Sequence, residues 1–152
     1  MDNTKDVKEF FEALGEIWRD ITAIEFLMRC ALAQKEGDSE KFPLPPYKKG
    51  KIYKEYPTAF SYTYFSDVAK EFNKHFPNLT IPLEIIKLRN AMAHGIIAEI
   101  NHSGVDELIN FKKQDGALLT EFTMRLETQR LQGIRKSLAD LRRHIAREAT
   151  DK

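Results

Sequence analysis

The sequence has a single cysteine, Cys30, among its 152 residues. One cysteine excludes an internal disulfide and a metal site of several thiolates, and it is typical of proteins from a reducing cytoplasm. No apolar run approaches the roughly 20 residues that a membrane-spanning helix needs. The first residues, MDNTKDVKEF, contain two aspartates and lack the apolar core of a signal peptide. We therefore predict a cytoplasmic protein.

Neither sign of charge is in excess, because 24 Lys and Arg oppose 23 Asp and Glu and give a formal net charge of +1. This balance argues against a protein that coats DNA through its overall charge, but it permits a local basic patch. Apolar residues make up 42% and charged residues 31% of the chain, fractions that exclude wholesale disorder. The length suffices for one core and not for two, so we predict a single domain over residues 1–152.

Sequence motifs for metals and phosphate-binding loops are also missing. The four histidines show neither HxxxH nor HExxH spacing: they are His75, His94, His102 and His144. The seven glycines are scattered and form neither a GxGxxG nor a GxxxxGK pattern. We therefore predict no metal and no cofactor, and we interpret Cys30 as a small core residue.

Apolar residues spaced three and four apart predict long helices at both ends of the chain. The first helix covers residues 5–34, with the apolar series Phe11, Leu14, Trp18, Ile21, Met28 and Leu32. Glu25 belongs to the same series, so the pattern places a carboxylate within the face that should be buried. The last helix covers about 126–148, with the series Leu131, Ile134, Leu138, Leu141 and Ile145.

Two shorter helices are predicted between these. One lies within residues 58–76 and has one apolar face, formed by Phe65, Val68, Ala69 and Phe72. The other spans about 82–94, because Pro82 suits a first turn and Gly95 suits a left-handed residue just beyond the end. Residues 42–54, FPLPPYKKGKIYK, contain three prolines and predict an ordered, irregular connection.

Short segments rich in Ile, Leu and Phe predict strands over residues 96–101, 107–113 and 117–123. Asp115-Gly116 is a strong hairpin turn signal between the last two. The predicted fold class is mainly α: an antiparallel helical bundle of about four helices with a small antiparallel β meander inserted before the last helix.

The segment LRNAMAHG, residues 88–95, gathers Arg89, Asn90 and His94 within two turns of one predicted helix. Asn90 and His94 are four residues apart and share a face. A purely structural interpretation places the arginine on the rim, the asparagine in a local hydrogen bond and the histidine against the helix dipole. A buried Glu25 needs a partner, which is Arg89 or His94, or else Arg29 four residues further along.

LRNAMAHG resembles the motif of HEPN domains, small helical proteins of prokaryotic conflict systems and of some eukaryotic RNA-processing factors. Their motif is an Arg, often followed by Asn, and then a His after four to six intervening residues. Arg89, Asn90 and His94 match it with four intervening residues, and Ala93 and Gly95 match the common RN-x-x-A-H-G version. A polar or acidic residue of the first helix often faces the motif in this family, and Glu25 is the match. The resemblance therefore implies a single HEPN-like helical domain.

The resemblance implies a metal-independent endoribonuclease that acts as a homodimer on RNA, as a toxin or phage-defence effector. Such cleavage needs a base for the 2′-OH, an acid for the leaving 5′-oxygen and a cation for the phosphorane charge. Two copies of His94 would share the acid and base roles, and Arg89 would bind phosphate oxygens. Asn90 would orient His94 or the phosphate. The implied partners include a cognate antitoxin, such as a nucleotidyltransferase-type protein.

A path for single-stranded RNA is predicted at four lysines interleaved with tyrosines, namely Lys48, Lys49, Lys51 and Lys54. The basic face of the last helix is a second candidate for this path. Both segments also have a purely structural interpretation, as charged surfaces in contact with solvent. Two other functions stay open. The first alternative is a non-catalytic HEPN dimerisation or regulatory module. The second is a small helical nucleic-acid adaptor that uses the tyrosine–lysine segment alone.

Overall fold

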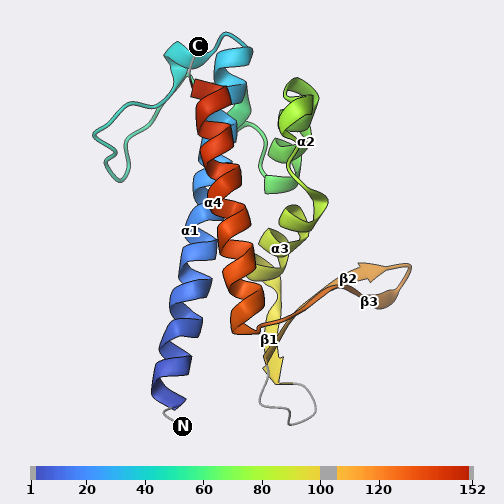
Figure 1. Ribbon diagram of the computed structural model, residues 1–152. Coiled ribbons are helices and arrows are strands. Elements are labelled where there is room, and N and C mark those ends of the chain that lie inside the picture. Colours follow the sequence, from blue (N-terminus) through green and yellow to red (C-terminus); the bar gives the residue numbers. More distant parts are fainter. Residues whose placement is uncertain (1–2, 100–105, 151–152) are drawn as a thin grey trace. The chain divides into compact units, whose positions relative to one another are not determined.

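The computed structural model describes residues 3–99 and 106–150 (Figure 1). The described helices are α1 (Asn3–Lys35), α2 (Phe65–His75), α3 (Leu83–His94) and α4 (Thr128–Thr150). The strands are β1 (Ile96–Glu99), β2 (Asp106–Gln114) and β3 (Ala117–Arg125). Three short 3-10 turns lie at Ser39–Lys41, Thr58–Phe60 and Pro77–Leu79. The predicted class, mainly helical with an antiparallel sheet before the last helix, is confirmed. The predicted end of the first strand, residues 100–101, and His102 lie outside the described residues.

The chain divides into two compact units, each built from two stretches of sequence. Unit 1 comprises residues 1–22 and 82–141, and unit 2 comprises residues 23–81 and 142–152. The helices α1 and α4 therefore each contribute one segment to both units.

Unit 1 contains the whole three-stranded sheet, in the order β1-β2-β3, with antiparallel pairing throughout. The turn between β2 and β3 has positive φ at both Asp115 and Gly116, as a type I′ hairpin requires. The distal part of this hairpin, residues 111–121, is exposed on both faces and extends away from the rest of its unit (Figure 1). In this unit the segments of α1 and α4 lie side by side and run in the same direction (Figure 1).

The core of unit 1 combines aliphatic side chains of helices and strands. Its buried members are Ala13, Ile17, Ile21, Leu88, Ala91, Leu108, Met124, Leu126, Leu131 and Leu138. The predicted face of α1 is partly wrong in this half, because Phe11 is 62% exposed and Trp18 is 38% exposed. The buried series 13–17–20–24 has the same spacing as the predicted series 14–18–21–25, shifted by one residue. A shift of one residue rotates the buried face by about 100° about the helix axis. Both series fit the helical period of about 3.6 residues, so tertiary packing decides which of them is buried.

Gly95 ends α3 for a different reason from the predicted one. Its backbone is extended (φ −80°, ψ −179°), so the prediction of a left-handed conformation is wrong. A Cβ at this position would lie 2.6 Å from the carbonyl oxygen of Ile109 and closer still to that of Ala91. Glycine is needed here because the end of α3 and the strand β2 approach too closely to admit a side chain.

Unit 2 is built around the second half of α1 and the short helix α2. The predicted apolar face of α2 is confirmed, since Phe65, Val68, Ala69 and Phe72 are all fully buried. They share the core with residues of α1 and α4, namely Ile24, Met28, Ala31, Leu32 and Ile145. The aromatic stretch before α2 forms a 3-10 turn at Thr58–Phe60 and then extended chain, and the helix begins at Phe65.

Candidate functional site

The motif residues lie on the last two turns of α3, in unit 1. The helix begins after Pro82, whose carbonyl accepts hydrogen bonds from the N–H groups of Ile85 and Ile86. It ends at His94, as predicted, and the N–H of Gly95 closes the last turn on the carbonyl oxygen of Ala91 at 2.7 Å. The motif therefore lies on a helix that ends at His94.

Burial separates the anchoring residues of α3 from the motif side chains. Leu88 is 4% exposed and Ala91 is fully buried, so these two residues fix the helix on the core of unit 1. Arg89 and Asn90 are half-buried, whereas His94 is exposed. The structure thus brings Arg89, Asn90 and His94 together on one helix end, with the imidazole accessible to solvent.

Apolar surface borders the motif. Strand β1 follows His94 after one residue, and its first side chains, Ile96 and Ile97, are 53% and 51% exposed. β1 is an edge strand of its sheet, so one row of its backbone groups is free of sheet partners within the described chain. Exposed apolar residues beside an unpaired edge are typical of a surface that another chain covers.

Glu25 lies in unit 2, and its recorded partner is the local one. Its Oε1 accepts a hydrogen bond from Nη2 of Arg29 at 2.9 Å. Arg29 also donates to the carbonyl oxygens of Ala59 (2.5 Å) and Tyr62 (3.0 Å), and its guanidinium lies 5.6 Å from the Phe60 ring. The two hydrogen bonds from Arg29 to backbone carbonyls hold residues 59–62 against α1. Of the partners considered for Glu25, the one observed is therefore Arg29, and a place for Glu25 beside the motif stays a prediction.

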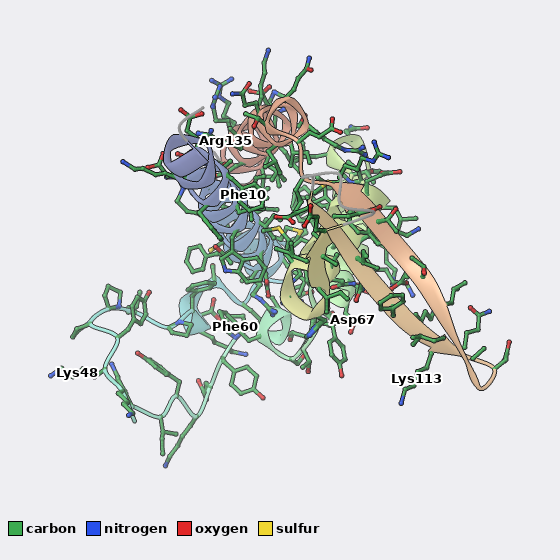
Figure 2. The ribbon with its side chains drawn as sticks, turned by 90° about the horizontal axis from the view of Figure 1, so that it is seen from below. Phe10, Lys48, Phe60, Asp67, Lys113 and Arg135 are labelled. Atoms are coloured by element: carbon green, nitrogen blue, oxygen red, sulfur yellow. The ribbon has the colours of Figure 1, made fainter. Side chains whose placement is uncertain are left out.

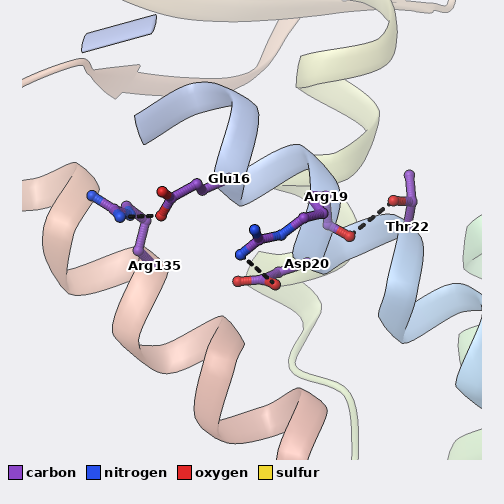
Figure 3. Close-up of polar contacts among 5 residues, drawn as sticks. All are labelled: Glu16, Arg19, Asp20, Thr22 and Arg135. Atoms are coloured by element: carbon purple, nitrogen blue, oxygen red, sulfur yellow. Dashed lines mark hydrogen bonds and ion pairs between the residues drawn. The ribbon is translucent and has the colours of Figure 1, made fainter. Parts of the chain in front are cut away.

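A second acid of α1, Asp20, was missed by the sequence analysis. It is only 3% exposed, and it belongs to unit 1, as the motif does. Its Oδ1 lies 3.7 Å from Nη2 of Arg19, an ion pair that Figure 3 shows beside that of Glu16 with Arg135. The available signal was its spacing, three residues after Ile17 and four before Ile24, both fully buried. A buried carboxylate is costly unless it is partnered, so Asp20 is a stronger candidate than Glu25 for the acid of the first helix.

The basic face predicted for the last helix is partly neutralised. Arg135 of α4 forms an ion pair with Glu16 of α1. The cavity of about 240 Å³ next to this pair is lined by further acids, Glu9 and Glu12. This part of unit 1 is therefore a poor surface for a polyanion.

The four predicted RNA-binding lysines, Lys48, Lys49, Lys51 and Lys54, are all exposed on the irregular connection in unit 2. Figure 2 shows Lys48 pointing outward from this segment. The connection is ordered by its tyrosines: the hydroxyl of Tyr47 donates to the carbonyl oxygen of Pro43 (3.1 Å) and that of Tyr53 to Leu44 (3.2 Å). Nζ of Lys51 lies 4.9 Å from the Tyr53 ring. The predicted alternation of lysine and tyrosine is thus a solvent-facing surface.

Asp38 closes the base of this connection. Its Oδ2 accepts hydrogen bonds from the backbone N–H (3.3 Å) and the hydroxyl (3.1 Å) of Thr58, and its Oδ1 lies 3.3 Å from Nζ of Lys41. The Thr58 N–H and then the Lys41 ammonium hold the pKa of Asp38 below its usual range. The carboxylate therefore ties the two ends of the lysine-bearing segment together.

Among the residues that the structure describes, no three His, Cys, Asp or Glu side chains are grouped closely enough to hold a metal ion. Within the same residues, no helix is both long and apolar enough to cross a membrane. Comparisons with protein-family models, with curated proteins and with solved structures found no match to this chain. The family resemblance therefore stays a prediction that depends on residues 88–95.

Proposed function

We propose that this chain is a metal-independent endoribonuclease of the HEPN type that acts as a homodimer, as a toxin or phage-defence effector. The observation that supports the proposal most directly is the grouping of Arg89, Asn90 and His94 at one end of α3, with His94 exposed. An exposed imidazole and a guanidinium within two turns of one helix provide a proton-transfer group and a phosphate-binding cation.

The reaction transfers two protons and needs no metal. One imidazole takes the proton of the RNA 2′-OH as its oxygen attacks the adjacent phosphorus. A second imidazole gives a proton to the 5′-oxygen as the P–O bond breaks, which leaves a 2′,3′-cyclic phosphate. Arg89 stabilises the charge on the non-bridging phosphate oxygens, and Asn90 orients the histidine or the phosphate.

A dimer follows from the number of groups required. One chain supplies a single His94 at this helix end, whereas the reaction uses an acid and a base. A two-fold axis close to α3 provides both from identical surfaces. The exposed Ile96 and Ile97 on the edge strand next to the motif support an interface there, because a second copy would remove them from water.

The four exposed lysines of the irregular connection are the proposed RNA contacts. Lysine ammonium groups bind phosphate without reading sequence, so they would bind the backbone of a single strand while neighbouring tyrosines stack on bases. A toxin of this kind also requires a cognate antitoxin, for which a nucleotidyltransferase-type protein is the proposed partner.

The test uses His94→Ala, with Glu84→Ala as the matched control, because Glu84 is exposed in the first turn of the same helix. Purified proteins are incubated with single-stranded RNA in EDTA, and products are separated by length. We expect cleavage by the wild type and the control, and a loss of about a hundredfold or more in His94→Ala. Intact RNA with wild type, or equal cleavage by His94→Ala, contradicts the proposal.

The second candidate function is a non-catalytic HEPN dimerisation or regulatory module. The half-burial of Arg89 and Asn90 favours it, because partly buried polar side chains often stabilise packing. This function predicts a wild-type dimer that does not cleave RNA, and dissociation of that dimer by Arg89→Ala in sedimentation experiments. Cleavage by a stable wild-type dimer would exclude it.

A further inference from the structure

A cavity of about 610 Å³ lies in unit 2, separate from the motif residues and from the lysine-bearing connection. This volume is within the range of about 300–1,000 Å³ that small-molecule sites occupy. Its walls come from the end of α1, from the end of α2 with the 3-10 turn that follows, and from the last part of α4. None of the described residues that line it is acidic.

Basic residues from three helices converge on this cavity. Lys35 is the last residue of α1 and His75 the last residue of α2, whereas His144 and Arg147 lie three residues apart on α4 and share a face. The same segment of α2 includes an acid, Glu71, but it is engaged by Lys74, whose Nζ lies 2.6 Å from its Oε1. The convergence of cations without an acid in the described lining favours an anionic ligand.

Cations at these positions also have a structural interpretation, because a helix C-terminus carries about half a negative charge and favours them. Three such ends would offset most of the charge of Lys35 and Arg147. The ammonium group of Lys35 is nevertheless directed toward the cavity. Its Nζ lies 5.7 Å from the centre of the Phe76 ring, which also lines the cavity. The two histidines add further hydrogen-bond donors, so binding of modest affinity is expected.

The non-ionic part of the lining narrows the class of anion. The Phe76 ring is stacked on Phe72, with centroids 4.6 Å apart, and provides a fixed apolar surface beside Lys35. Asn78, exposed on the following turn, supplies an amide that both donates and accepts hydrogen bonds. Cations for a phosphate, an aromatic surface and an amide are together the groups that recognise a nucleotide.

We propose that this cavity binds a nucleotide, with its phosphate held by Lys35 and Arg147 and its base near Phe76 and Asn78. The nucleotide is either free or the end of an RNA chain, since both present the same phosphate ester. This site requires neither His94 nor RNA cleavage, so it can be tested whether or not the chain is a nuclease.

The test measures binding of AMP and of a 2′-O-methyl RNA hexamer, which no 2′-OH mechanism can cleave, by titration calorimetry. The variant is Lys35→Gln with Arg147→Gln. The control is Lys70→Gln with Arg130→Gln, which removes the same charge from exposed positions of α2 and α4 outside the cavity. We expect about a tenfold or greater loss of AMP affinity in the cavity variant and no more than about twofold in the control.

Hexamers with and without a 5′-phosphate separate the two sources. Tighter binding of the phosphorylated hexamer than of the unphosphorylated one identifies an RNA end as the ligand. Tighter binding of AMP than of either hexamer identifies a free nucleotide. The proposal is overturned by the absence of saturable AMP binding at millimolar concentrations or by equal losses in both double variants. Inorganic phosphate binding as tightly as AMP also overturns it, because the base would then contribute nothing. If the double variant unfolds on circular dichroism, Arg147→Gln alone and Asn78→Ala give the same readout.

Discussion

Replacing Gly95 by alanine tests the close approach that ends α3 beside His94. The added methyl group would lie 2.6 Å from the carbonyl oxygen of Ile109 and closer still to that of Ala91. Both neighbours are backbone atoms, so no rotamer change relieves the contact. The extended backbone of Gly95 is open to alanine, and the expected cost is therefore steric and not torsional.

The magnitude follows from what must move. Overpacking of this kind costs about 1–3 kcal/mol. The carbonyl of Ala91 accepts the hydrogen bond that closes the helix, and Ile109 lies opposite Ile96 in the β1–β2 ladder, whose hydrogen bonds begin there. Loosening either hydrogen bond adds about 0.5–1.5 kcal/mol. The lower entropy of the unfolded alanine chain returns about 0.4–1 kcal/mol. The central values give a net loss of about 2 kcal/mol in the free energy of unfolding.

Urea unfolding followed by far-ultraviolet circular dichroism measures this loss. Gly15→Ala and Gly133→Ala are matched controls, because both glycines are helical and an added Cβ would meet nothing within 4 Å. These controls should be stabilised by up to about 1 kcal/mol, since alanine is the better helix former. A Gly95→Ala protein as stable as the wild type, or stabilised like the controls, would refute the steric argument.

Three further predictions concern the proposed interface, the connection and the thiol. Ile97→Glu should convert a dimer to monomers in sedimentation experiments, whereas Leu118→Glu, at a still more exposed site of the hairpin, should not; equal effects would contradict an interface at β1. Asp38→Asn should speed proteolysis within residues 42–57. Because folding lowers the pKa of Asp38, its stabilisation is present at neutral pH and lost only as pH falls through that lowered pKa; cleavage rates that already rise between pH 7 and 5 would refute this. Burial raises the pKa of the Cys30 thiol above its usual range, so iodoacetamide should alkylate it more slowly at pH 8 than an unfolded sample; equal rates would contradict the burial.

The elements that could be predicted from the sequence depend on local patterns. The apolar face of α2 and the hairpin turn at Asp115-Gly116 follow from spacing and backbone preference, and the structure confirms them. The end of α3 at His94 is also as predicted, although Gly95 is extended there and not left-handed. The cavity of unit 2 could not be predicted, because its lining comes from residues 35, 75–79, 144 and 147. No local pattern relates segments so distant in the chain.

The same limit applies to the carbonyl contacts of Arg29, which reach residues about 30 positions away. From the sequence, Arg29 was only one of three possible partners of Glu25. Its hydrogen bonds to the carbonyl oxygens of Ala59 and Tyr62 depend on how the irregular connection returns to α1, and that path is determined by packing rather than by helical period.

The acid of the first helix shows how a small error in helical phase changes a candidate site. A 33-residue helix with apolar residues around much of its circumference permits two series one residue apart, and each contains one acid. The predicted buried series includes the aromatic residues Phe11 and Trp18, and its acid is Glu25. The structure leaves Phe11 and Trp18 exposed and buries Ala13, Ile17 and Ile24, and the acid within this series is Asp20. The later members of the predicted series, Ile21, Met28 and Leu32, are buried as expected. Glu25 is engaged by Arg29 in unit 2, whereas Asp20 is buried in the unit that holds Arg89 and His94. A carboxylate that is almost fully removed from water is retained only where its surroundings stabilise it, so burial makes Asp20 a stronger candidate than Glu25 for a functional acid of the first helix.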